Sequence, residues 1–368
     1  MSISPPSDEK GILPDRLIMA LVKTGVVIAA GILDEDQVQP ASIDLRLGEI
    51  AYRVRASFLP GPASTVAQRI DELKLHEFPL GDGAVLETGC VYIVPLMESL
   101  ALPPDLAASA NPKSSTGRLD VFTRVIADKT RGFDRINAGY RGPLYAEISP
   151  RTFPVLVREG SRLSQLRFYR GHARVSGDAL ATLHRREHLV DTDAPDLSDG
   201  VPVGVDLVGF GADKFIGYRA KRHTGLIDVD RRASYEIAEF WEPIRARRDR
   251  SLILDPDEFY ILASKEAVQV PPDYAAEMVP FDPLVGEFRV HYAGFFDPGF
   301  GYDGAGGRGS RAVLEVRSRE VPFIIEHGQI VGRLVYERML TRPDTLYGRD
   351  IGSNYQAQNL KLSKHFRG

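Results

Sequence analysis

Short runs of apolar and β-branched residues alternate with turn residues along most of the chain. Clear examples are Val91–Val94, Ala312–Val316 and Gly332–Tyr336. Short apolar runs of this kind, separated by glycine and proline, are typical of strands in a sandwich or barrel and not of alternating strand–helix units. The pattern therefore predicts a mainly β protein with a few short helices.

Helix signals are confined to two segments. The first is Asp15–Gly25, where Pro14 precedes the segment and glycine ends it, as expected at the two ends of a helix. The second is Ala179–Val190, which is followed by the polar run Asp191–Gly200. A polar run rich in aspartate, proline and glycine is typical of a connection between domains. We therefore expect two helices, the second of them inside a linker over 176–199.

One part of the sequence occurs twice. The hexapeptide Pro103–Ala108 (PPDLAA) recurs as Pro271–Ala276 (PPDYAA), 168 positions later. The same offset relates further pairs of identical residues: Tyr92 and Tyr260, Glu98 and Glu266, Pro112 and Pro280, Glu147 and Glu315, Pro154 and Pro322, Gly160 and Gly328, Leu166 and Leu334. A fixed offset held over this length indicates two copies of one β-rich unit.

The repeat divides the chain into four parts. We expect a first unit over 12–175, the linker over 176–199, a second unit over 200–342 and a tail over 343–368. Extra loops are expected around Thr123–Asp134 in the first copy and around Tyr302–Ser310 in the second.

Composition narrows the class of protein. The chain has 368 residues, of which 43% are hydrophobic and 26% charged, and its formal net charge is −4. These values are ordinary for a globular protein and do not fit a generally basic nucleic-acid-binding protein, so Arg245–Arg250 is interpreted as a solvated face. With no run of 18 apolar residues and no signal peptide, we expect a soluble cytoplasmic protein that binds neither membrane nor nucleic acid.

The single cysteine limits the available chemistry. Cys90 allows no internal disulfide and no cysteine-based zinc site. His184 and His188 have the spacing of zinc ligands on one helix face, but they lie beside the linker without an obvious third ligand. The glycine-rich Gly304–Gly309 precedes a predicted strand, whereas a dinucleotide site requires a helix there.

One loop has the residues of a phosphate site. Lys113-Ser114-Ser115-Thr-Gly-Arg118 combines small hydroxyl side chains with fixed cations in a turn that contains glycine. Hydroxyls, backbone amides and an arginine can converge on phosphate oxygens in such a loop, although a plain surface turn has the same composition. Downstream, Glu147 falls in an apolar strand, where a carboxylate is costly unless it is paired or used; an exposed edge strand is the alternative.

These segments resemble the dCTP deaminases, a family within the trimeric dUTPase-like superfamily. The resemblance rests on the phosphate motif and on further motifs along nearly the whole chain: Gln39–Gly48, Gly139–Gly142, Glu147, Gly160–Leu166 and the tail segment Tyr347–Gln358. The length resembles a double-length form with two family units in one chain. The resemblance implies two tandem dUTPase-like β-barrel or jelly-roll units.

The resemblance also implies an activity and a site. It implies hydrolytic deamination of dCTP to dUTP and ammonia in pyrimidine deoxynucleotide biosynthesis, without zinc and with Mg²⁺ bound through the triphosphate. It places Ser114 and Arg118 at the reactive water, Glu147 as the catalytic base, and Lys113, Ser115, Arg135, Tyr347 and Gln358 around the nucleotide. It further implies a homo-oligomer, most simply a trimer, and dTTP as a possible inhibitor. Two departures are lysine at Lys113, where the family has arginine, and Asn354, where the tail has lysine.

The two copies are not equivalent. In the second copy the phosphate motif is replaced by Pro280–Glu287, which lacks the serines and the arginine, yet Glu315 is kept. We expect a composite site in which first-copy residues from more than one chain, including Glu147, are closed by the tail. The competing arrangement has Glu315 facing the cradle of the first copy across an interface.

Two other functions stay open. In dUTP pyrophosphatases an aspartate in a comparable turn activates water, but the first-copy turn has Asn137, which cannot act as a base. The second copy has Asp297, so a pyrophosphatase or a bifunctional enzyme is one alternative. A non-catalytic module that senses nucleotides is the other.

Overall fold

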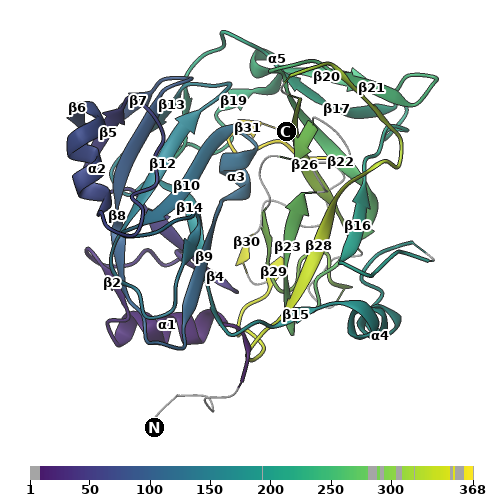
Figure 1. Cartoon of the computed structure of the whole chain (residues 1–368). Helices are drawn as coiled ribbons and strands as arrows, with labels where there is room; N and C mark the ends of the chain where they lie inside the picture. Colours follow the sequence, from purple (N-terminus) through teal and green to yellow (C-terminus); the bar gives the residue numbers. More distant parts are fainter. Residues whose placement is uncertain are drawn as a thin grey trace.

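A computed structural model describes most of the chain as two β units. The described residues are 9–192, 194–280, 288–290, 294–303, 309–318, 320–348, 351–352 and 360–367, with backbone alone at 288–290 and 351–352. Strands numbered up to β14 form one unit, drawn from purple to teal in Figure 1, and most later strands form the other, drawn from teal to yellow. The mainly β class with two units is confirmed.

The first unit is built from two six-stranded sheets with antiparallel pairing. One sheet contains β11 (Arg135–Ile136), β9 (Ala107–Pro112), β14 (Arg162–Arg170), β4 (Ser42–Arg46), β3 (Val38–Gln39) and β1 (Gly11–Ile12). The other contains β10 (Val121–Ala127), β12 (Arg141–Pro150), β8 (Val91–Ala101), β5 (Ile50–Val54), β6 (Lys74–Pro79) and β2 (Val27–Ala29).

The second unit has two five-stranded sheets. One contains β15 (Arg174–Val175), β28 (Ile330–Arg338), β23 (Tyr274–Pro280), β25 (Phe295–Phe296) and β16 (Val201–Gly204). The other contains β20 (Trp241–Arg245), β17 (Phe215–Ala220), β22 (Phe259–Val268), β26 (Ser310–Ser318) and β24 (Phe288–Val290).

Smaller sheets complete the fold, and one of them crosses between the units. It contains β18 (Ile227–Asp228), β13 (Val155–Val157) and β7 (Ala84–Leu86), in that order. The pairs are β21 (Ser251–Leu254) with β27 (Phe323–Glu326), β19 (Tyr235–Glu236) with β31 (Phe366–Arg367), and β29 (Tyr347–Gly348) with β30 (Ile351–Gly352). Because β18 belongs to the second half of the sequence and β13 to the first, the two units share backbone hydrogen bonds.

The repeat in the sequence is a repeat in structure. The offset of 168 relates β8 to β22, β12 to β26 and β14 to β28 almost residue for residue. The Tyr92 hydroxyl accepts the backbone N–H of Glu87 at 3.1 Å, and the Tyr260 hydroxyl accepts that of Asp255 at 3.0 Å, so even this side-chain contact is duplicated.

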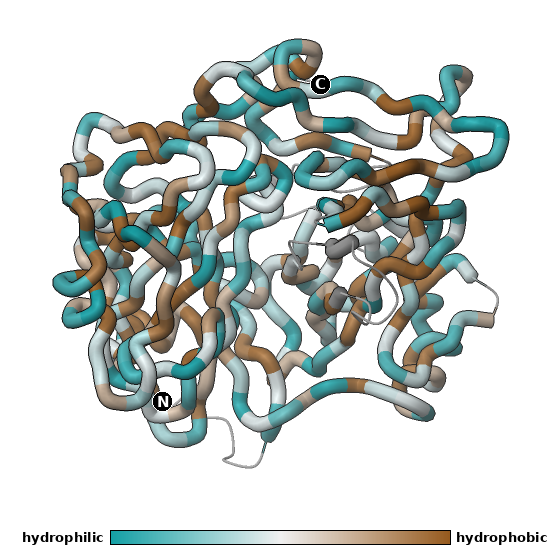
Figure 2. The backbone as a smooth tube through the Cα atoms, turned by 45° about the horizontal axis from the view of Figure 1, so that its top comes forward, coloured by the Kyte–Doolittle hydropathy of each residue, from teal (hydrophilic) through white to brown (hydrophobic). Residues whose placement is uncertain are grey.

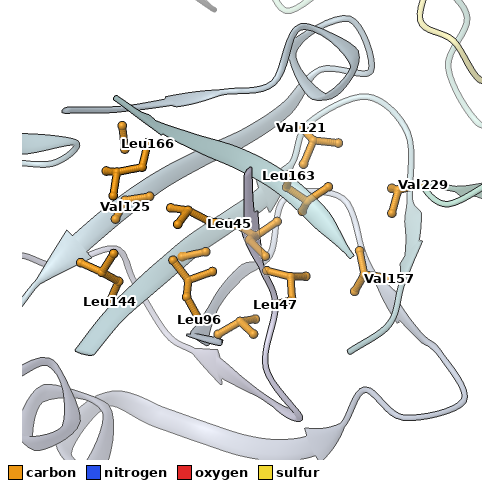
Figure 3. Close-up of a cluster of buried hydrophobic side chains, with 14 of the residues drawn as sticks. Leu45, Leu47, Leu96, Val121, Val125, Leu144, Val157, Leu163, Leu166 and Val229 are labelled. Atoms are coloured by element: carbon orange, nitrogen blue, oxygen red, sulfur yellow. The ribbon is translucent and has the colours of Figure 1, made fainter. Parts of the chain in front are cut away.

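Alternating apolar positions on these strands form the core. Figure 3 shows side chains from β4, β10, β12 and β14 meeting between the sheets of the first unit, among them Leu45, Val125, Leu144 and Leu166. Val229, which follows β18, joins the same cluster, and Figure 2 shows hydrophobic stretches along the strands of both units. Removal of this apolar surface from water is the main stabilising term.

Both predicted helices are present. Asp15–Lys23 forms α1 after Pro14, and Gly177–Glu187 forms α4 within the predicted linker. The prediction missed α2 (Val66–Leu73), although Thr65 and Gln68 form a capping box, which is a recognisable start signal. The remaining described helices are single turns, α3 (Ser114–Gly117) and α5 (Ile237–Phe240). None of the helices in the described part of the chain is long and apolar enough to cross a membrane.

The loop predicted around Thr123–Asp134 was placed too early. β10 covers Val121–Ala127 and pairs with β12 along its whole length, so only the residues after Ala127 form a connection. Thr123 and Arg124 are polar, which made this stretch look like a loop. The neighbouring apolar residues Val121 and Val125 are buried in the core.

The duplicated tyrosine contacts give a test of the repeat. Replacing Tyr92 or Tyr260 by phenylalanine removes one buried acceptor, and we expect each change to lower the free energy of unfolding by about 1 kcal/mol. The two effects should add, because the sites lie in different units. Urea denaturation of both variants and the double variant measures this; a large loss at one site with none at the other would contradict the structural equivalence.

Candidate active site

A cavity of about 390 Å³ lies between the two units. The first unit contributes the loop and single turn Lys113–Arg118 together with residues of β4 and β14, and the second contributes β25, β26 and the turn after β25. In Figure 1, α3 faces the second unit across the middle of the molecule. The cavity is therefore assembled from both copies within one chain.

Local sequence explains the shape of the cradle. Pro112 ends β9 because proline cannot donate to a ladder. The Lys113 N–H then donates to the Leu163 carbonyl at 2.9 Å, and the Lys113 carbonyl accepts the Thr116 N–H at 2.8 Å, which closes the turn α3. Ser115 and Arg118 are buried there, whereas Ser114 is half-buried and lines the cavity.

Cations and carboxylates gather on the first-unit side. Lys113 pairs with Asp44 on β4, and Arg162 on β14 lies 2.8 Å from Asp36 and 3.5 Å from Asp44. The hydrogen bond from Arg162 lowers the pKa of Asp36 below its ordinary value. Arg232 and Lys364 also line the cavity, so the cluster suits an anionic group.

Glu315 enters the cavity from β26 of the second unit. Its side chain is buried, with 5% of the residue exposed, and burial raises the pKa of its carboxyl to about 7. Arg118 opposes this shift, with its Nε 3.9 Å from Oε1 of Glu315. A carboxyl that titrates near neutrality can both take and return a proton.

Aromatic residues form another wall. The Phe296 and Phe300 rings lie 4.9 Å apart between centroids, and Tyr347 follows at 5.7 Å from Phe300. At Gly299 the backbone has φ of +98°, and a Cβ there would meet the Tyr347 carbonyl oxygen at 2.9 Å, so glycine is required for this approach of the tail. Such a wall suits a planar base.

Asp297 lines the same cavity but is already paired. Burial raises its pKa, and Arg167, which is fully buried, donates to its Oδ1 at 3.1 Å. Ladder register identifies Asp297 as the counterpart of Asn137, since Phe296 pairs with Ala276 as Ile136 pairs with Ala108.

The residues nearest the C-terminus contact the cradle directly. Ser363 Oγ donates to the Ser115 carbonyl at 2.7 Å, and Arg118 Nη1 donates to the Lys361 carbonyl at 2.8 Å. These contacts bring the neighbouring Lys364 to the cavity wall.

The structure brings together five of the predicted nucleotide-site residues, namely Lys113, Ser114, Ser115, Arg118 and Tyr347, along with the second-copy carboxylate Glu315. Arg135 is exposed on β11, where it pairs with Ser109, and is not among the residues described as lining the cavity. Gln358 and Asn354 lie outside the described residues.

Glu147 does not face this cavity in one chain. It is 1% exposed on β12, and Arg124 on β10 donates to its carboxylate, with Nε 3.1 Å from Oε1. Arg124 itself is stacked over Phe133, 3.4 Å from the ring centroid. Within one chain, therefore, the cradle shares its cavity with Glu315 and not with Glu147.

Several lining residues were not predicted: Asp36, Asp44, Arg162, Arg232, Arg311 and Lys364. Asp44 lies in the motif Gln39–Gly48 and Arg162 in the motif Gly160–Leu166, but neither motif indicates a role for the individual residue. Arg232 and Lys364 belong to no motif, and only the docking of the two units places them here.

The part of the chain that the structure describes contains no cluster of side chains that could hold a metal ion. No three histidine, cysteine, aspartate or glutamate residues there are grouped so that they could hold an ion. His184 on α4 and His188, the left-handed residue that ends this helix, have ring centroids 6.3 Å apart, and no third ligand joins them among the residues described.

A cation cluster beside a buried, titratable carboxyl and an aromatic wall defines an enzyme that acts on a phosphate-bearing aromatic compound. Two family models match the chain: the N-terminal domain of 2'-deoxycytidine 5'-triphosphate deaminase over residues 9–172 and its C-terminal domain over residues 176–366. The chain therefore belongs to the dCTP deaminase family, and it is an enzyme with dCTP deaminase activity.

Individual relatives agree with this assignment. The dCTP deaminase of Halorubrum lacusprofundi is 34% identical over 160 residues, which are 43% of this chain and 76% of the relative. A protein of Methanobrevibacter smithii described as "dCTP deaminase, dUMP-forming" is 28% identical over 162 residues, 43% of this chain and 79% of that protein. The crystal structure of 2'-deoxycytidine 5'-triphosphate deaminase from Agrobacterium tumefaciens is 64% identical, with a TM-score of 0.87, and covers 90% of this chain and 99% of its own.

Replacing Glu147 by glutamine separates a structural from a catalytic role. The change leaves Arg124 without its counter-charge, and we expect the free energy of unfolding to fall by about 1–3 kcal/mol. The kcat for dCTP, measured well below the unfolding transition, should stay close to that of the unchanged chain. A collapse of kcat in a folded variant would return the catalytic role to Glu147.

Proposed function

We propose that Glu315 is the catalytic base and later acid in the hydrolysis of dCTP to dUTP and ammonia. The observation that carries this proposal is a buried carboxyl with a pKa raised to about 7, lining the same cavity as the Lys113–Arg118 cradle. General acid–base catalysis is most effective when the pKa of the group lies near the working pH.

Glu315 takes a proton from the water that attacks C4 of cytosine and returns it toward the base as the amine leaves. Ser114, half-buried on the facing wall, orients that water through its hydroxyl. Arg118 stabilises the ionised form of Glu315 and so prevents its pKa from rising further. Tyr347, Phe296 and Phe300 exclude bulk water and hold the ring.

The triphosphate binds on the cationic side. Lys113 and Ser115 lie in the cradle, and Arg162 and Arg232 face them. A remote, highly charged group supplies binding energy that fixes the base beside the water, so a substrate lacking phosphates should react slowly even when saturating.

Mg²⁺ fits this side of the cavity as a partner of the triphosphate. Asp44 Oδ1 is buried without a hydrogen-bond partner among the described residues, and with Asp36 it would face the water shell of the ion. Bound there, the ion would neutralise phosphate charge. Activation of water is assigned to Glu315, because its pKa of about 7 suits a group that takes a proton near neutral pH.

Assembly and regulation belong to the same proposal. We propose a homo-oligomer, most simply a trimer, with dTTP competing for the nucleotide site. Exposed apolar side chains at Ile32, Leu75 and Ile324 provide surface for contacts between chains.

The first test replaces Glu315 by glutamine. We expect kcat for dCTP to fall by about 10²–10⁴-fold with binding retained, because glutamine cannot take a proton. Ammonia release and equilibrium dCTP binding are the measurements. The matched control is Glu147→Gln, the same change at the equivalent position of the other copy. An equal loss of kcat in both variants would contradict the assignment of Glu315 as the catalytic base.

The pH dependence follows from the same carboxyl. Since burial raises the pKa of Glu315 to about 7, the base is mostly protonated at pH 6 and ionised at pH 8. We expect kcat/KM to rise as the pH increases from about 5 to about 7, because this carboxyl ionises over that range. A profile that is flat from pH 5 to 8 would contradict this role.

Stability should respond in the opposite direction. The carboxyl ionises near its ordinary value of 4.5 when unfolded and near 7 when folded, so the unfolding free energy falls as pH rises through this window. At pH 8, Glu315→Gln should therefore raise it by up to about 3 kcal/mol, and at pH 4 change it little. Urea denaturation at both pH values checks the sign; a variant that is less stable at pH 8 would contradict the buried charge.

Asp297 gives a specific reason to test a second step. It lines the same cavity and could activate water at phosphorus, although its pairing with Arg167 favours a structural role. We propose that the enzyme releases dUTP as its product and does not hydrolyse it further. Incubation with dCTP should give dUTP and ammonia; dUMP and pyrophosphate that disappear in Asp297→Asn would show the bifunctional alternative, and nucleotide binding without turnover would show a sensor.

A further inference from the structure

The segment Leu360–Arg367, here named the strap, is anchored to both units. Its end forms β31, which pairs in parallel with β19 through Tyr235 and Phe366. Phe366 is 6% exposed and packs against Phe240 and Trp241, with ring centroids 5.5 and 5.9 Å away. An apolar anchor of this kind fixes the path of the residues before it.

Hydrogen bonds then tie the strap to the cradle. Ser363 donates to the Ser115 carbonyl, and the Lys361 carbonyl accepts from Arg118. His365 is 2% exposed, and burial lowers its pKa to about 4, so the ring is neutral. Its Nε2 donates to the Val229 carbonyl at 2.8 Å, and its Nδ1 lies 2.8 Å from Ser363 Oγ. Lys364 lies between these two anchored residues.

The position of Lys364 is electrostatically unusual. Its side chain lines the cavity near three other cations, Lys113, Arg162 and Arg232. The nearby carboxylate of Asp44 stabilises the charged form of Lys364. Like charges this close repel one another unless an anion lies between them. A lysine held rigidly in such a cluster is therefore arranged for a ligand with several negative charges.

We propose that Lys364 binds the phosphate groups of the nucleotide, and that the strap holds it against the cradle so that the site distinguishes a triphosphate from a monophosphate. The inference rests on the proposed placement of dCTP in this cavity. It makes the strap a fixed part of the site and gives the cavity a cation from outside the Lys113–Arg118 loop.

The charge state of Lys364 supports the same geometry. Burial lowers its pKa to about 8, with further lowering by Lys113, Arg232 and Arg162 and opposition from Asp44. In the absence of nucleotide Lys364 therefore loses its proton between pH 7 and 9, and a bound triphosphate favours the protonated form. Binding of dCTP should weaken over this range.

The test compares Lys364→Met with Lys364→Arg and with Lys361→Met, a matched control on the exposed face of the strap. Each change is made in the Glu315→Gln background, and equilibrium binding of dCTP, dCDP and dCMP is measured by calorimetry. We expect Lys364→Met to weaken dCTP binding by about 10- to 100-fold and dCMP binding little. Lys364→Arg should largely restore dCTP binding and remove its decline from pH 7 to 9.

Two outcomes would overturn the inference. They are equal losses for dCTP and dCMP, and a Lys364→Met variant that binds dCTP as well as Lys361→Met does. Arg118→Ala separates this failure from a failure of the proposed function. If Arg118→Ala weakens dCTP binding while Lys364→Met does not, only the present inference fails; if neither variant weakens it, the nucleotide does not occupy this cavity.

Discussion

The contact between Arg118 and Glu315 is the interaction on which the proposed site depends. The arginine comes from the first copy and the glutamate from the second, and their charged atoms lie 3.9 Å apart in a buried setting. At that distance the attraction offsets only part of the cost of burying the carboxylate, which leaves its pKa near 7. A closer pair would hold the carboxylate ionised, and an absent one would hold it protonated.

The docking of the two units controls this distance. Arg317, two residues beyond Glu315 on β26, pairs with Asp120, two residues beyond Arg118, and also donates to Thr152 Oγ1 at 3.0 Å. Beside this junction Phe153 of the first unit packs against Phe240 and Trp241 of the second, at 5.7 and 5.4 Å between ring centroids. The polar pair joins β26 to the turn that precedes β10, and the aromatic cluster provides the apolar burial that holds the two units together.

Sequence patterns predicted what depends on local order and repetition. The strands, the helices after Pro14 and in the linker, and the duplication all carry signals within short stretches. The choice between Glu147 and Glu315 has no such signal, because both occupy the same position of the same strand in their copies. Lys364 shows the same limit, since its role arises from a strap that reaches the cradle 248 positions after Ser115, where Ser363 binds.

The two glutamates occupy equivalent positions of the two copies but lie in different surroundings. On β12, Arg124 donates to Glu147 through both Nε and Nη2, and the stacking of Arg124 on Phe133 fixes that pairing. Glu315 on β26 faces Arg118 of the first unit. This arginine also donates to the Lys361 carbonyl, and its Nε lies 3.9 Å from Glu315 Oε1. Glu147 is therefore held by a directly paired arginine, whereas Glu315 is buried with a more distant counter-charge and keeps a pKa near 7. Under the proposed function, duplication allowed one copy to keep the cradle and the other to keep the reactive carboxyl, provided that the two units dock in one fixed arrangement.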